Sequence, residues 1–167
     1  MVKREGSSSG FNETLEGMDA EEMKDYILAT FDGLQTADNA GDTFFTYDPD
    51  GDLPQDRWLP FATLVTGDHY DTVSDLTRPG AYRLNLGLTT ATYADLFGKA
   101  PTERDENGLL LTGVDYTAVD TLMPHPFYAS QHWVCVVNPG AATLDTVRKL
   151  LDEAYGFAVR KYGNRRG

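Results

Sequence analysis

Cysteine, lysine and long apolar runs are all scarce in this chain of 167 residues. The single cysteine, Cys135, excludes an internal disulfide framework and is typical of a reducing compartment, so we expect a cytoplasmic protein. No apolar run approaches the roughly 20 residues that span a bilayer, and we therefore expect no membrane partner. The glycine-rich phosphate loops GxGxxG and GxxxxGK[ST] and the GxSxG turn are also missing. These absences exclude the commonest nucleotide-dependent and hydrolase functions.

Basic residues are few compared with acidic ones. The chain has 14 Lys and Arg against 26 Asp and Glu, which gives a formal net charge of -12. Phosphate binding normally depends on clustered Lys and Arg, so this balance disfavours nucleic acid as a partner. A dense basic group is found only at the C-terminus, where we expect it to complement the negative end of the last helix. It consists of Arg160, Lys161, Arg165 and Arg166.

The length of the chain is typical of one domain. Residues 1–17 are rich in serine and glycine and carry few large apolar side chains, which predicts a disordered tail. Residues 18–162 are predicted to form a single α+β domain, and residues 163–167 a flexible C-terminus.

Three segments have the apolar spacing of helices. Asp19 and Glu22 form a predicted capping box, and the apolar stripe behind them predicts a helix over about 20–33. A short helix is predicted over 90–97, and a long one over about 143–161.

Short runs rich in β-branched and aromatic residues predict strands. Residues 109–111 and 114–122 are ambiguous between strand and short helix. Because the strands lack regular helical crossovers, we expect an antiparallel sheet flanked by an N-terminal and a C-terminal helix. The strands are predicted over 43–47, 61–66, 81–86 and 132–137.

Potential metal ligands are present, but their spacing does not match known sites. A calcium loop that starts at Asp48 would need glycine and glutamate where the chain has Leu53 and Leu59. The histidines lack the i, i+4 spacing of a helical zinc pair, and one cysteine cannot make a cysteine cluster. We therefore predict no metal site and no cofactor. The histidines are His69, His125 and His132.

The most unusual group of residues is polar. Arg83 and Asn85 share the strand face opposite Leu84, in a chain with few cations. One interpretation is that the arginines pair with some of the 26 acids. The other is that this face lines a pocket for a small anionic or aromatic ligand. The candidate ligand-binding residues are Arg78, Arg83, Asn85, His125, Tyr128, His132 and Trp133.

Several stretches resemble a bacterial domain family of unknown function. They are PFATLVT (60–66), RPGAYRLNLG (78–87) and LMPHPFYASQHWVCVVNPG (122–140), and they carry the motifs RPGxxRLNxG and LMPHPxYxxxxWVCVxNP. The last stretch and the closing helix are also distantly similar to the MmcQ/YjbR-like family. That second resemblance implies a small YjbR-like α+β fold with an antiparallel sheet. Neither resemblance assigns catalytic residues.

Three hypotheses for function follow. The leading one is a non-enzymatic module that binds a small ligand or a protein through the face bearing Arg83 and Asn85. The alternative is a small enzyme that uses His132 or His125 as acid or base while Arg78 or Arg83 holds an anionic substrate. DNA binding is a third hypothesis, which the charge disfavours. The sequence leaves the oligomeric state open.

Overall fold

The computed structural model describes residues 17–166, so almost all of the predicted N-terminal tail lies outside the described residues. Three α-helices, six strands and two short 3-10 helices form between these limits. In chain order they are α2 (Ala20–Thr30), β1 (Leu34–Asn39), β2 (Asp42–Tyr47), η1 (Gln55–Arg57), β3 (Ala62–Val65), β4 (Arg83–Gly87), α3 (Thr90–Phe97), β5 (Met123–Pro124), η2 (Ala129–Gln131), β6 (Trp133–Val137) and α4 (Leu144–Arg166).

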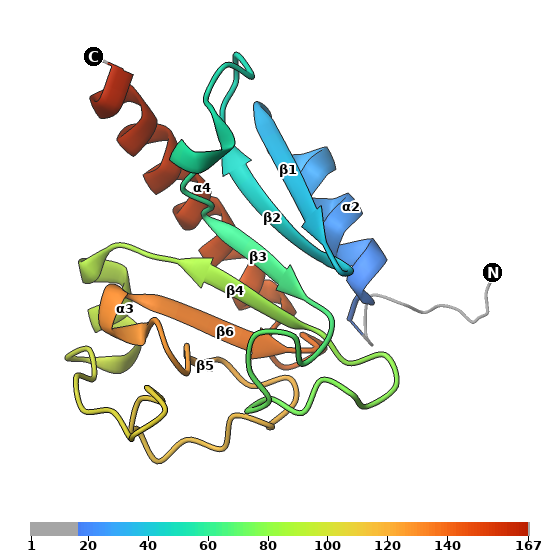
Figure 1. The fold of residues 1–167 in the computed structure, drawn as a ribbon, viewed down its shortest axis with the longest axis vertical. Helices are drawn as coiled ribbons and strands as arrows, with labels where there is room; N and C mark the ends of the chain where they lie inside the picture. The colour runs from blue at the N-terminus through green and yellow to red at the C-terminus, as the bar shows by residue number, and fades with distance from the viewer. Residues whose placement is uncertain (1–16, 167) are drawn as a thin grey trace.

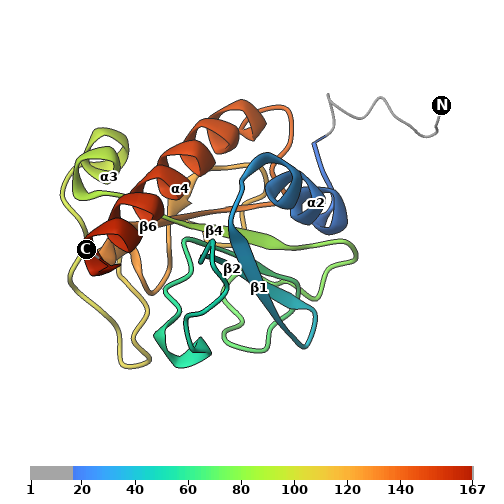
Figure 2. The same cartoon turned by 90° about the horizontal axis from the view of Figure 1, so that it is seen from above.

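The described strands form one antiparallel sheet in the order β1-β2-β3-β4-β6-β5. Figure 1 shows the long helix α4 crossing behind this sheet, and Figure 2 shows α2, α3 and α4 on one side of it. Loops lie on the other side. The predicted α+β class, with an antiparallel sheet and a helix near each end of the chain, is confirmed.

The main core lies between the sheet and the helices. Alternate strand residues such as Phe45, Leu84 and Val136 are buried there against Ile27 of α2 and Leu151 of α4. Because strand side chains alternate, the neighbours of these residues point to the other face. The predicted division of β4 into an apolar and a polar face therefore corresponds to the two faces of the sheet.

Element ends differ from the sequence-based expectation at both ends of the chain. Helix α2 ends at Thr30, and the strand β1 that follows was not predicted. The reason is that the β1 sequence, LQTADN, has one large apolar residue, so the strand depends on backbone pairing with β2. Ala40 and Gly41 have positive φ angles of 54° and 91°, which suits a two-residue hairpin turn. At the other end, α4 continues beyond residue 161 to Arg166.

The second face of the sheet is covered only in part. A smaller apolar cluster forms where the loops around residues 66–81 and 109–122 fold over the face of β6. Its buried members are Val65, Leu76, Tyr116, Met123, Cys135 and Val137. Next to this cluster, over the middle of the sheet, the same face borders a cavity.

Candidate ligand-binding cavity

The cavity on the second face of the sheet has a volume of about 660 Å³. Strands β2, β3, β4 and β6 contribute to it together with the surrounding loops. Its aromatic lining residues are Phe44, Tyr70, Phe127, Tyr128 and Trp133. Its polar lining residues are Thr63, Asp71, Arg83, Asn85, Arg104, His125 and Gln131.

Trp133 borders the cavity because of a glycine in the neighbouring strand. Gly87 of β4 lies opposite Trp133 of β6. A Cβ atom at Gly87 would lie only 2.8 Å from Cε2 of the Trp133 side chain. The missing side chain therefore lets the indole ring lie across β4.

Arg83 is buried in a network rather than free to bind an anion. It is 2% exposed. Its Nη1 and Nη2 donate to Oδ1 and Oδ2 of Asp71 at 3.2 and 3.0 Å. Nη1 also donates to Ser74 Oγ at 2.9 Å, and Nε to Asn85 Oδ1 at 3.1 Å. The Asp71 carboxylate neutralises Arg83, as in the first of the two interpretations made from the sequence.

Asn85 extends this network along the sheet. Its Nδ2 donates to Thr63 Oγ1 at 2.9 Å, across from β4 to β3. With Oδ1 accepting from Arg83, the side chain is held at both ends. The polar floor of the cavity is therefore rigid and carries no net charge.

His125 is buried at the cavity and is held in one tautomer. It is 3% exposed, and its Nδ1 accepts the backbone N–H groups of Phe127 and Tyr128, both at 3.1 Å. Burial, assisted by the positive charge of Arg83, lowers the pKa of His125 well below the usual histidine value. The ring is thus neutral, and because Nδ1 is an acceptor its proton is on Nε2. His125 can offer a ligand a hydrogen-bond donor.

Arg104 lines the cavity from the loop between α3 and β5 and was not among the predicted site residues. Its Nη1 donates to the carbonyl oxygens of Gly108 and Phe127 at 2.8 and 3.0 Å, and its Nη2 to Ser130 Oγ at 2.8 Å. Within residues 17–166 no carboxylate forms an ion pair with it. Three hydrogen bonds fix the position of its charge, and none of the described carboxylates neutralises it. In the sequence it sits in the polar run KAPTERDENG, where nothing distinguishes it from its neighbours.

Two predicted site residues lie elsewhere. Arg78 donates to the backbone oxygens of Ser74, Asp75 and Thr117, and so holds two loops together. His132 has a positive φ of 73° at the end of η2, and its ring lies 5.7 Å from that of Tyr93 in α3. The structure therefore gathers only part of the predicted set around the cavity. The gathered residues are Arg83, Asn85, His125, Tyr128 and Trp133.

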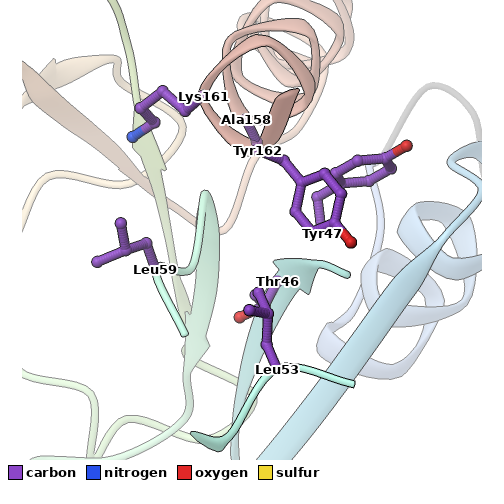
Figure 3. A pocket seen from close by; sticks show the side chains of 7 residues that line it. All are labelled: Thr46, Tyr47, Leu53, Leu59, Ala158, Lys161 and Tyr162. Carbon is purple, nitrogen blue, oxygen red and sulfur yellow. The ribbon is translucent and has the colours of Figure 1, made fainter. Parts of the chain in front are cut away.

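A second, far smaller hollow lies near the end of α4, and Figure 3 shows the side chains that line it. Its volume is about 20 Å³, which matches one water molecule and excludes an organic ligand. It lies between strand β2, the following loop and α4. Its lining residues are Thr46, Tyr47, Leu53, Leu59, Ala158, Lys161 and Tyr162.

Groups that could hold a metal or act as a nucleophile are not assembled in the described residues. No three His, Cys, Asp or Glu side chains of residues 17–166 are placed to hold a metal ion. Asp48 instead accepts the backbone N–H of Leu53 within its own turn. Burial raises the pKa of the Cys135 thiol to about 12, so the thiol is inert at neutral pH.

A comparison with protein-family models assigns the chain to a family. Residues 18–167 match the model described as a family of unknown function, DUF6194. The chain belongs to the DUF6194 family. This confirms the resemblance to a domain family of unknown function, whereas the YjbR-like similarity stays a prediction. Neither the curated proteins nor the solved structures contain a match.

The DUF6194 match includes every residue that lines the cavity. Among the described helices of this DUF6194 protein, none has the length and apolar character needed to cross a membrane.

Proposed function

We propose that this DUF6194 protein is a non-enzymatic module that binds a small, flat organic molecule in the cavity on the second sheet face. One observation carries the proposal: aromatic side chains and immobilised polar groups converge on a hollow of about 660 Å³. Ligand pockets of about 300–1,000 Å³ lined by aromatic residues and a few fixed polar groups are typical of small-molecule sites. We also propose a cytoplasmic location, which is consistent with the free Cys135.

The enzyme hypothesis has less support. A general base needs a free lone pair, but Nδ1 of His125 already accepts two backbone N–H groups. His132 contacts α3 and does not line the cavity. Arg83 is paired with Asp71, and Arg78 with backbone oxygens, so neither is available to hold an anionic substrate.

DNA binding also has less support. The cavity is suited to one small molecule, and the net charge of -12 repels a phosphate backbone.

The proposal is tested with protein purified from its source organism and examined by native mass spectrometry. We expect a bound small molecule that appears as a discrete mass increment. In a second experiment, any bound molecule is removed from the purified protein. The protein is then exposed to a metabolite extract of the same organism, which serves as the probe.

Tyr128 provides the variant, because its side chain is 53% exposed and stacks near His125 without supporting the core. Tyr128→Ala should weaken binding about two- to tenfold and so lower occupancy at subsaturating ligand, since an aromatic contact contributes roughly 0.5–1.5 kcal/mol beyond its buried area. Leu111→Ala is the matched control, because Leu111 is 57% exposed and does not line the cavity. Equal occupancy in both variants would refute the proposal. So would the absence of an adduct both on the protein as purified and on the protein exposed to the extract.

A further inference from the structure

Two buried side chains at the cavity offer a ligand hydrogen-bond donors. His125 has its Nε2–H, and Asn85 has a second Nδ2–H besides the one given to Thr63. Asp71 is the one acidic residue among the described lining residues, and both of its carboxylate oxygens accept from Arg83. The immobilised N–H groups of His125 and Asn85 therefore favour a ligand that carries oxygen acceptors.

Arg104 adds a positive charge to this donor-rich surface. Three of its five N–H groups are used by Gly108, Phe127 and Ser130, which leaves two for a ligand. These three contacts hold the guanidinium in place, so little side-chain entropy is lost when an anion binds. The charged lining residues, Asp71, Arg83 and Arg104, thus carry a net charge of +1, whereas the whole chain carries -12.

We infer that the ligand is an aromatic carboxylate, with its carboxylate on Arg104 and its ring against Trp133 and Tyr128. This inference rests on the proposed function. The remaining N–H groups of one arginine match a single carboxylate, whose two oxygens can each accept one of them. A phosphate dianion would need further cations, and the other lining arginine, Arg83, is neutralised by Asp71.

The opposite possibility is a cationic ligand, because cages of aromatic side chains also bind ammonium groups. The exposed rings of Tyr70 and Tyr128 border the cavity and could suit such a ligand. Two observations speak against it. The carboxylate of Asp71 is already paired, and the charge of Arg104 would repel an ammonium group.

The test uses three probes that share one ring: 2-naphthoate, 2-naphthamide and 2-naphthylmethylammonium. Their dissociation constants are measured by titration calorimetry with the full-length protein. We expect the carboxylate to bind about tenfold or more tighter than the amide, because hydrogen bonds to charged groups exceed neutral ones by such a factor. The ammonium probe should bind weakest. A ranking with the ammonium probe first, or equal binding of carboxylate and amide, overturns the inference.

Arg104→Gln then tests the residue. Its affinity for 2-naphthoate should fall about tenfold to the level of the amide, while its affinity for the amide stays unchanged. Arg148→Gln is the control for net charge, because Arg148 lies on α4 over the Tyr26 ring and outside the cavity. Carboxylate preference that survives in Arg104→Gln refutes the assignment. If Arg104→Gln does not fold, the ranking of the three probes on the unmodified protein decides.

Failure of the inference and failure of the proposed function are distinguishable. If the amide binds as tightly as the carboxylate, the cavity is still a binding site, and only the inferred preference for a carboxylate is refuted. If no probe binds at millimolar concentration while the metabolite extract yields an adduct, the occupant is not an aromatic carboxylate. If neither experiment detects binding, the proposed function fails as well.

Discussion

At the scale of single residues, Arg83 has a structural task that its position in the strand alone does not reveal. Alternation along β4 predicted that Arg83 and Asn85 share a face opposite Leu84, and the structure places them so. Its acidic partner, Asp71, comes from a loop with no regular pattern, so no periodicity could identify it. The pattern of residue types within a strand indicates which face of the sheet each side chain lies on. The partner of a buried charge, in contrast, is brought close only by folding.

Breaking the Arg83–Asp71 pair should be costly, because Asp71 would remain a nearly buried charge with 11% of its side chain exposed. We expect Arg83→Leu to lower the free energy of unfolding by about 3–5 kcal/mol. The double variant Arg83→Leu/Asp71→Leu should recover most of that loss, since neither charge is left unpaired. Urea unfolding at pH 7 measures both values.

If the double variant is as unstable as the single one, the loss of stability comes from the lost packing of the Arg83 side chain and not from an unpaired charge. Lys24→Leu is the comparison, because Lys24 pairs with Asp38 at 3.4 Å on the surface. Its loss should cost no more than about 1 kcal/mol.

At the scale of elements, the turn before α4 depends on a distant carboxylate. Asp120 accepts the backbone N–H groups of Gly140, Ala142 and Thr143 as well as the Thr143 hydroxyl. Burial by itself would raise the pKa of Asp120, but these hydrogen bonds together lower it below the usual aspartate value. The loop that covers the second apolar cluster is thereby tied to the start of the longest helix.

Asp120→Asn should destabilise the protein in a pH-dependent way. The pKa of Asp120 is lower in the folded than in the unfolded state, so its stabilisation is complete above the unfolded value of about 3.9. That stabilisation disappears as the pH falls through the lowered folded pKa. We expect Asp120→Asn to cost about 1–2 kcal/mol at pH 7, within the range for carboxylate caps and charged hydrogen bonds, and less at pH 3.

Urea unfolding at pH 7, 5, 4 and 3 gives the difference between the variant and the unmodified protein. A difference that is constant over this range would contradict the role of the carboxylate charge. Asp152→Asn is the control, since Asp152 is an exposed residue of α4 and should change stability little at any pH.

Most elements could be predicted from local signals, and the exceptions have a physical reason. Asp19 and Glu22 form the expected capping box, and α3 occupies the predicted residues. Strand β1 has few apolar residues and β5 is two residues long, so both depend on pairing with a neighbouring strand. Residues 109–111 and 114–122 were ambiguous because they form no regular element and cover the sheet through individual side chains.

At the scale of the whole molecule, the sheet separates two apolar clusters, and Cys135 belongs to the smaller one. The thiol is buried beside Met123 and Val137, with a pKa raised to about 12 by burial. Its sulfur donates to the carbonyl oxygen of Pro124 in the neighbouring strand β5, at 3.9 Å. Access of a reagent to this sulfur therefore requires the second face of the sheet to open.

Cys135 should thus report unfolding of that face. At pH 8 we expect the native protein to react with a thiol reagent such as 5,5′-dithiobis(2-nitrobenzoate) over hours, and the protein in 8 M urea within minutes. The physical reason is that the thiolate is both excluded from solvent and a minor species at this pH. Absorbance of the released thiolate follows the reaction. Native labelling as fast as that in urea would contradict the burial of Cys135.

Local signals in the amino-acid sequence were sufficient to predict the class of fold and the two-sided character of the strands. Capping residues and the alternation of side chains are local properties, so they can be recognised without knowing which segments meet. The contents of the second sheet face, in contrast, depend on long-range packing. Arg104 is positioned by Phe127 and Ser130, and Arg83 by Asp71, through contacts between segments far apart in the chain. Such contacts depend on how the loops pack, and the position of Arg104 at the cavity, without an ion pair among the described residues, follows from that packing.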